Sequence, residues 1–198
     1  MWYWILRSFF VFVAKVFFRL KVEGLENIPQ KTNFIIVANH NSFLDPPLIM
    51  AAVPRKIYCI ALRDLHRMLW VKWILALAEA LPSGSVSEKA VNLLMKNKNV
   101  GLFPEGGVSR DGTLKEFRRG AALLALKTGR PIVPCAILGT FQALPFGERI
   151  PRRVPIKLKI AKPVFLLKEF DDIIDDVYLQ EGIFRIRNII KEMLDTPR

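Results

Sequence analysis

Short apolar runs alternate along most of this chain with longer stretches whose apolar residues have helical spacing. Buried strands are predicted where such a run is bounded by turn residues, at 34–40, 56–62, 99–107 and 131–138, the third running into a loop. Helices are predicted at 42–53, 63–81, 87–98, 115–130 and 173–195. Residues 154–164 alternate apolar and basic positions, as in an outer strand. This order predicts an α/β fold with a mostly parallel sheet flanked by helices.

The first 20 residues have the pattern of an amphipathic helix with a basic face. Its polar residues are Arg7, Ser8, Lys15 and Arg19, which fall within an arc of roughly 120° at about 100° per residue. The opposite side is apolar and contains Trp2, Ile5, Phe9, Phe12, Val13, Val16 and Leu20. Three of the polar residues are charged, so the stretch resembles neither a signal peptide nor a spanning helix. We therefore predict a membrane-anchoring amphipathic helix at 1–21 and an α/β domain at 22–198.

The polar arc of this helix is not clean, because Trp4, Val11 and Phe18 lie inside it or at its edge. A helix that lies deep in the bilayer interface tolerates such residues. The alternative is a core helix packed on the domain. The many aromatic residues, and the lack of any acid before Glu23, favour the bilayer.

The composition narrows the class of partner. The chain has 198 residues, which suits one domain with a substantial core; it is 52% hydrophobic and has a formal net charge of +12. A basic, apolar protein suits an anionic membrane surface. Nucleic acid is not expected, because the sequence has no zinc-finger spacing and no stacking motif of the RNA-recognition type. Cys59 and Cys135 lie in apolar runs and are expected to be buried thiols.

The first of the chain's two histidines lies in a polar segment that follows a predicted strand. In NHNSFLDP, at 39–46, His40 precedes Asp45 by five residues. From the first turn of the next helix, the carboxylate can fold back and accept a hydrogen bond from one imidazole nitrogen. That contact would fix the tautomer and leave the other nitrogen free to take a proton. The alternative is that Asp45 only caps the helix and His40 packs.

A second polar segment, FPEGGVSRDG at 103–112, also follows a predicted strand. Ligands of open α/β sheets bind beyond the carboxyl ends of the strands, so both segments are expected to face one cleft. Ser109 is the candidate nucleophile, but the nucleophile elbow of hydrolases needs a glycine where Asp111 stands. Without a protein nucleophile, the proton that His40 removes would belong to a substrate such as an alcohol. Direct acyl transfer is then a candidate reaction.

Three segments in this order and spacing, NHNSFLD, FPEGGVSRDG and PIVPCAI, resemble the glycerolipid acyltransferases, most closely bacterial 1-acylglycerol-3-phosphate acyltransferases. The resemblance covers residues 22–165 and implies that His40 and Asp45, an H-x4-D pair, are catalytic. It also implies a membrane helix joined to an α/β domain. Pro134 falls in a block whose role is structural or part of the acyl site. The block that would hold the acceptor's glycerol phosphate contains Phe103, Pro104, Glu105 and Gly106.

Two positions depart from the family's pattern. Val108 stands where a phosphate-binding arginine is usual, and the second block, which usually ends in arginine, has Ser83 and Gly84. Backbone amides near Gly106 and Gly107 are candidate donors to an oxyanion. The candidate replacements for the arginine are nearby basic residues, some of which could be only a solvated face: Arg110, Lys115, Arg118 and Arg119.

The expected activity is transfer of a fatty acyl group from acyl-CoA or acyl carrier protein to the free hydroxyl of lysophosphatidic acid. His40 would be the base and Asp45 its orienter. No metal or cofactor is expected, and the implied partners are a lipid bilayer, the lysophospholipid and the thioester donor. The expected location is the cytoplasmic face of the inner membrane, as a peripheral or monotopic protein. Alternatives are an acyltransferase for another lysolipid or an amino-acid lipid, a lipid hydrolase that uses Ser109, and a non-catalytic membrane-binding protein.

Overall fold

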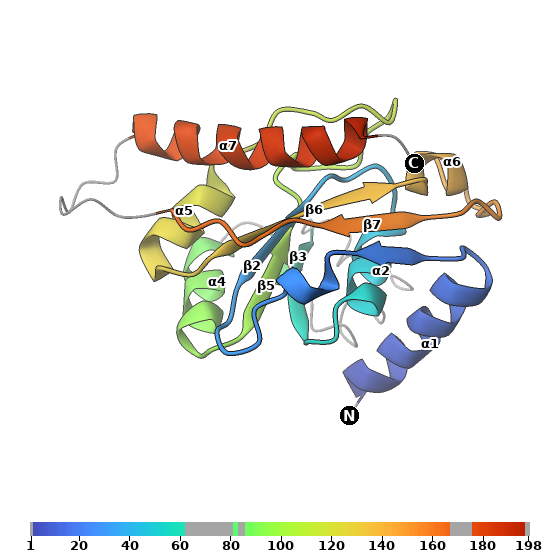
Figure 1. Cartoon of the computed structure of the whole chain (residues 1–198), viewed down its shortest axis with the longest axis horizontal. Coiled ribbons are helices and arrows are strands. Elements are labelled where there is room, and N and C mark those ends of the chain that lie inside the picture. Colours follow the sequence, from blue (N-terminus) through green and yellow to red (C-terminus); the bar gives the residue numbers. More distant parts are fainter. Residues whose placement is uncertain (1, 62–80, 83–85, 167–175, 197–198) are drawn as a thin grey trace.

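The computed structural model describes residues 2–61, 81–82, 86–166 and 176–196 (Figure 1). The helices are α1 (Trp2–Val16), α2 (Asp45–Ala52), α4 (Val86–Met95), α5 (Gly120–Thr128), α6 (Thr140–Ala143) and α7 (Asp176–Asp195), with a 3-10 turn at Leu25–Asn27. The strands are β1 (Lys21–Glu23), β2 (Ile35–Ala38), β3 (Ile57–Ala61), β4 (Leu81–Pro82), β5 (Asn99–Leu102), β6 (Ile132–Leu138) and β7 (Lys157–Ile160). The predicted helix at 63–81, apart from its last residue, and the block with Ser83 and Gly84 lie outside the described residues.

The described strands form a seven-stranded sheet in the order β1-β7-β6-β2-β5-β3-β4. Neighbouring strands are parallel except for β6 and β7, which are antiparallel. In the central strand β2, Ile36 pairs with Val133 of β6 on one side and with Gly101 of β5 on the other. The predicted α/β fold with a mostly parallel sheet is confirmed.

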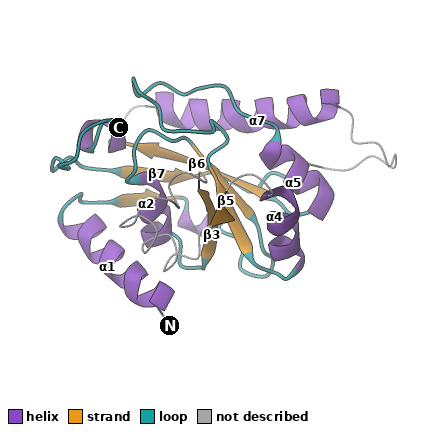
Figure 2. Ribbon diagram, turned by 180° about the vertical axis from the view of Figure 1, so that it is seen from behind, coloured by secondary structure: helices purple, strands orange, loops and turns teal. Residues whose placement is uncertain are grey.

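Helices cover both faces of the sheet (Figure 2) because its central strands are apolar on both sides. Successive side chains of a strand point to opposite faces, and all four residues of β2 are buried. Ile36 and Ala38 belong to the core shared with α1 and α2. Ile35 and Val37 belong to the core shared with α4, α5 and α7. The parallel strands β2 and β5 therefore end at one edge of a layered domain, and their loops meet there.

The prediction of an outer strand at 154–164 was wrong in its place in the sheet. Only Lys157–Ile160 form β7, and β1 flanks it on the outside, where Glu23 makes an ion pair with Lys157 (2.7 Å). β1 has only three residues, and its two outer residues are exposed, so it has no apolar run that periodicity could detect.

The helix predicted from residue 115 begins only at Gly120. In the preceding segment, Arg187 of α7 donates to the carbonyl oxygens of Lys115 (3.0 Å) and Leu114 (3.5 Å), and the side chain of Phe117 is buried. These tertiary contacts use carbonyl groups that an earlier helical turn would need for its own hydrogen bonds.

The helix α1 docks on the domain through the side that carries Arg7. The Arg7 guanidinium donates to the carbonyl oxygens of Ala51 (3.2 Å) and Val53 (3.3 Å) at the end of α2, and the buried Tyr3 hydroxyl accepts a hydrogen bond from the amide of Ile57 (3.1 Å). No described helix is long and apolar enough to cross a membrane. The helix both packs on the domain and leaves large apolar side chains exposed: Trp2, Trp4, Ile5, Phe9, Phe12 and Val16.

Candidate active site

The strand β2 carries the polar segment 39–45 to the edge of the sheet. Asn39, directly after the strand, is fully buried and continues the pairing with β6 through its side chain. Its Nδ2 donates to the carbonyl oxygen of Ile137 (3.0 Å), and its Oδ1 accepts from the amide of Ile137 (2.8 Å). These two bonds hold the chain in place immediately before His40.

His40 and Asp45 make the predicted contact, with 2.9 Å between the imidazole Nδ1 and Oδ2 of Asp45. The same oxygen accepts hydrogen bonds from the amides of Asn41 (2.7 Å) and Ser42 (2.8 Å), and Asp45 has no exposed surface. Two backbone amides already donate to this buried oxygen, which therefore serves as an acceptor, and Nδ1 makes the third contact as a donor. Nε2 is then the nitrogen that can act as a base. Asp45 thus shapes the loop and orients the imidazole at the same time.

The loop after β5 closes around His40 from the other side. The imidazole stacks on Phe103 at 4.2 Å between ring centroids, and the His40 side chain is only 13% exposed. The His40 amide donates to Oε1 of Glu105 (2.9 Å), while its carbonyl oxygen accepts from the amide of Ser109 (2.7 Å). The two predicted segments therefore lie at one site, as the sequence indicated.

Glu105 lies inside this junction rather than on the open surface. Its burial raises the pKa of the carboxyl group, and hydrogen bonds from the backbone amides of His40 and Lys115 oppose that shift. The Glu105 carboxylate therefore holds the backbone of the histidine loop. The prediction that Glu105 binds the acceptor is untested. In this structure the Glu105 side chain is buried and its Oε1 accepts from the His40 amide.

The backbone amides of Gly106 and Gly107 differ in whether they already have a hydrogen-bond acceptor. Gly106 has φ +76°, a conformation that favours glycine, and its amide donates to the carbonyl oxygen of Phe103 (3.2 Å). Among the described residues, the amide of Gly107 has no hydrogen-bond partner, and apart from residues 106–108 nothing lies within 4 Å of where a Cβ on it would be. Of the two predicted oxyanion donors, the Gly107 amide is the available one.

The three candidate arginines occupy different surroundings. Arg118 packs its guanidinium against Gly106, where an added Cβ would collide with Cζ, and its amide donates to the carbonyl oxygen of Pro104 (2.9 Å). Arg110 lies over the ring of Phe146 at 5.4 Å. Arg119 forms an ion pair with Asp176 of α7 (2.5 Å). Of these three guanidinium groups, that of Arg118 lies against Gly106, in the glycine loop (residues 105–107) beside His40.

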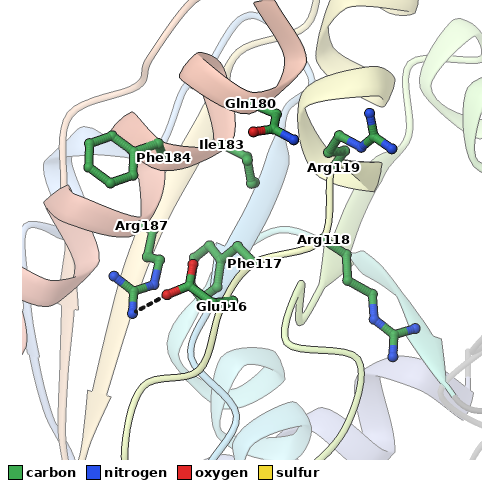
Figure 3. Close-up of a pocket in the computed structure, with 8 residues that line it drawn as sticks. All are labelled: Glu116, Phe117, Arg118, Arg119, Gln180, Ile183, Phe184 and Arg187. Atoms are coloured by element: carbon green, nitrogen blue, oxygen red, sulfur yellow. Dashed lines mark ion pairs between the residues drawn. The ribbon is translucent and has the colours of Figure 1, made fainter. Parts of the chain in front are cut away.

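A pocket lies between the segment 116–119 and α7 (Figure 3), and His40 is not among the residues that line it. Arg118 and Arg119 extend in different directions there, and the ion pair between Glu116 and Arg187 (3.0 Å) closes one end. The residues that line this pocket are Glu116, Phe117, Arg118, Arg119, Gln180, Ile183, Phe184 and Arg187. Arg118 is the residue that connects this pocket with the glycine loop.

The hydroxyl group of Ser109 makes its hydrogen bonds within its own loop. Its buried hydroxyl lies 2.9 Å from Oδ1 of Asp111 and 3.0 Å from the carbonyl oxygen of Thr113. Hydrogen bonds from Thr113 and from Ser109 lower the pKa of Asp111 to about 2. The contact with His40 is made by the amide of Ser109 and not by its hydroxyl. This arrangement does not support Ser109 as a nucleophile activated by His40.

Residues 19–138 match the family model described as Acyltransferase. The chain belongs to the acyltransferase family. A chloroplastic 1-acyl-sn-glycerol-3-phosphate acyltransferase of Brassica napus is 29% identical over 177 residues, which cover 80% of this chain and 51% of that protein. One from Borreliella burgdorferi is 31% identical over 130 residues, 62% of this chain and 52% of that protein. The chain spans about half the length of these curated relatives.

A solved acyltransferase structure has the same fold. The 1-acyl-sn-glycerophosphate acyltransferase PlsC of Thermotoga maritima superposes with a TM-score of 0.79 at 27% identity, covering 99% of this chain and 81% of that one. The similarity extends over the whole described layered domain, and it confirms the family that the sequence motifs indicated.

Two contacts of this acyltransferase site were missed by the sequence analysis. Asn39 was not singled out, although a polar side chain at the end of a buried run is a signal that it bonds to a neighbouring strand. The sequence analysis assigned no contact to Ser42, but its hydroxyl donates to the carbonyl oxygen of Leu144 (2.8 Å) and joins the loop 39–45 to the segment after α6. No local pattern links positions so far apart.

Proposed function

We propose that this acyltransferase moves a fatty acyl group from a thioester donor, acyl-CoA or acyl carrier protein, to the free hydroxyl of 1-acylglycerol-3-phosphate. The observation that carries the proposal is the oriented His40–Asp45 pair at the carboxyl end of β2. The names of the relatives from Brassica napus and Borreliella burgdorferi support the acceptor and the reaction.

In the proposed reaction Nε2 of His40 removes the proton of the acceptor hydroxyl as its oxygen attacks the thioester carbonyl carbon. The carbonyl oxygen becomes an oxyanion, to which the amide of Gly107 would donate. Collapse of the intermediate re-forms the carbonyl group and breaks the carbon–sulfur bond. The leaving thiolate takes the proton from the imidazolium, so that an ester and a free thiol are the products. Asp45 stabilises the imidazolium between the two steps.

We also propose that Arg118 binds the acceptor's phosphate in place of the arginine that Val108 replaces. A phosphate carries close to two negative charges, and a cleft that takes it in needs a cationic partner. The Arg118 guanidinium lies against Gly106, within the loop that the family resemblance assigns to the glycerol phosphate. Arg110 is the second candidate. Arg119 is the third, because its guanidinium already has Asp176 as a partner.

For membrane attachment we propose that α1 lies in the interface of the inner membrane, on its cytoplasmic face. Arg7, the basic residue in the middle of the helix, is turned toward α2, and Phe9 and Phe12 are 59% and 65% exposed. Burial of apolar side chains in the bilayer would then be the main source of binding.

The direct test uses the full chain and a panel of lysolipids, with both donor types, followed by mass spectrometry of the products. We expect phosphatidic acid from lysophosphatidic acid and loss of product formation in His40→Ala. If another lysolipid or an amino-acid lipid were acylated and lysophosphatidic acid were not, Val108 would mark a different acceptor. If a free fatty acid and an acyl-enzyme on Ser109 formed instead, the protein would be a hydrolase.

A further inference from the structure

The connection between α6 and β7, residues 144–156, forms one rim of the site beside His40. At one end the carbonyl oxygen of Leu144 accepts the hydroxyl of Ser42 (2.8 Å). At the other end the amide of Ile156 donates to the carbonyl oxygen of Phe18 (3.0 Å), just after α1. The rim thus connects the catalytic loop to the end of the exposed amphipathic helix.

Large apolar side chains of the rim are open to the surroundings. Ile150 is 79% exposed, and Phe146 and Phe43 of the catalytic loop are about half exposed, at 46% and 47%. Their two rings are neighbours, with 6.3 Å between centroids. Exposed apolar side chains that lie close together beside a functional site mark a contact surface.

Basic residues are interleaved with these apolar ones. Arg149, Arg152 and Arg153 are all exposed, and Arg110 stacks over Phe146. Only Glu148 opposes them within 144–156, and it pairs at 3.4 Å with Arg152. Guanidinium groups beside exposed aromatic and aliphatic side chains are complementary to an anionic lipid surface, where headgroup phosphates lie above the acyl chains.

The backbone of the rim is already restrained in the free protein, so binding would cost it little conformational entropy. Pro145, Pro151 and Pro155 restrict its backbone. The amide of Arg152 donates to the carbonyl oxygen of Ala143 (2.7 Å), which ties the middle of the connection back to α6. A preorganised loop loses little conformational freedom when it binds.

We propose that the rim, residues 144–156 together with Phe43, is a second lipid contact that seats the His40 site on an anionic bilayer. The inference rests on the proposed function, because an acceptor that resides in the membrane can then reach His40 without its acyl chain crossing water. α1 would hold the protein on the membrane, and the rim would set the orientation in which the cleft faces the lipid.

The test compares two rim variants with two matched controls in the full chain. The apolar variant is Phe146→Ser with Ile150→Ser, and its control is Met95→Ser on α4 with Val177→Ser on α7, both of which are exposed. The charge variant is Arg149→Glu, Arg152→Glu and Arg153→Glu. Its control reverses three exposed lysines away from the rim: Lys89→Glu, Lys96→Glu and Lys191→Glu.

Membrane binding is measured by flotation with vesicles of phosphatidylglycerol and phosphatidylcholine. Turnover is measured with acyl-CoA as the donor and with lysophosphatidic acid presented in two ways, in those vesicles or as a soluble short-chain form. Each rim variant should lower kcat/KM for the vesicle-borne acceptor about tenfold or more. The kcat/KM for the soluble acceptor should stay within about twofold of the value for the unaltered protein. The charge variant should also lower vesicle binding, and both controls should resemble the unaltered protein. Equal losses with both acceptors, or no loss with either, would overturn the proposal.

A competing occupant is an acidic protein that carries the donor. If the charge variant lost activity with acyl carrier protein but kept it with acyl-CoA on the same vesicles, the arginines would serve that protein and the lipid contact would be wrong. Should the unaltered chain acylate no lysolipid, the proposed function would fail, while the flotation result would still decide whether the rim binds lipid.

Discussion

Nδ1 of His40 lies 2.9 Å from the Asp45 oxygen that also accepts the amides of Asn41 and Ser42. One buried carboxylate therefore sets both the tautomer of the imidazole and the shape of the loop that carries it. Changing Asp45 affects two properties that can be measured separately, turnover and stability.

His40→Ala should lower kcat by about 10²- to 10⁴-fold, because the general base is lost. The variant should still fold, because the His40 backbone contacts with Glu105 and Ser109 remain, but it should melt lower because the ring's contacts with Phe103 and Asp45 are lost. Steady-state kinetics and thermal unfolding of the same samples check this. Near-normal turnover in His40→Ala would place the base elsewhere.

Asp45→Asn should lower kcat more than it raises the acceptor's KM, because the orientation of the base changes and the binding surface does not. It should also destabilise the fold. In Asp45→Asn a buried amide group would stand where the carboxylate oxygens now lie, and Oδ1 has no hydrogen-bond partner among the described residues. An unsatisfied buried polar group costs about 1–3 kcal/mol. Denaturant unfolding measures that cost, and unchanged kcat would contradict the orienting role.

Arg118→Ala should raise the KM for lysophosphatidic acid about tenfold, since charge-assisted hydrogen bonds contribute about 1.5–3 kcal/mol and about 1.4 kcal/mol is tenfold. The KM for the thioester should change less. Arg119→Ala is the matched control, because its guanidinium pairs with Asp176. Val108→Arg, which restores the family's usual residue, should recover acceptor binding in Arg118→Ala. Unchanged KM in Arg118→Ala would exclude this residue as the phosphate ligand.

Ser109→Ala should keep most of the turnover, because the Ser109 amide, which contacts His40, remains. The loop should become less stable, since the hydroxyl bonds to Asp111 and Thr113 are lost. A covalent acyl adduct in the unaltered protein, absent from Ser109→Ala, would support a hydrolase instead. Intact-protein mass spectrometry after mixing with the donor distinguishes the two outcomes.

Glu105→Gln should change how stability depends on pH. Burial raises the pKa of Glu105 in the folded protein, so its ionisation disfavours the folded state. The stability contributed by Glu105 is present below its unfolded pKa and is lost as the pH rises through its folded pKa. The variant lacks this loss, so its stability relative to the unaltered protein should be more favourable at pH 7 than at pH 4. Urea unfolding at the two pH values tests this, and equal differences would show that the pKa is not raised.

Phe9→Ser with Phe12→Ser should weaken vesicle binding about tenfold or more, because each large apolar side chain contributes about 1.5–3 kcal/mol when fully buried. The matched control is Val177→Ser with Phe184→Ser, whose exposed side chains lie on α7. High salt should leave the unaltered protein on vesicles, and detergent should release it. Release by salt alone would show that charge, rather than apolar burial, holds the protein.

The sequence by itself determined the strands β2, β3, β5 and β6 with the helices α1, α2, α4 and α7, the contact between His40 and Asp45, and the meeting of the two polar segments. Each of these depends on short-range patterns. Apolar periodicity selects helix or strand. Asp45, five residues after His40 and at the start of the next helix, is close enough for its carboxylate to fold back to the imidazole. The common edge of the parallel strands β2 and β5 then brings the loops after them to one place.

Only the tertiary structure decided which neighbours surround those elements. β1 was missed because three mostly exposed residues carry no pattern until β7 lies beside them. Arg110, Arg118 and Arg119 look alike in the sequence, but Phe146, Gly106 and Asp176 give them different partners. The orientation of α1 depends on acceptors at Ala51 and Val53, more than 40 residues from Arg7. Such contacts form between groups distant along the chain, and folding brings them together through packing that no local spacing encodes.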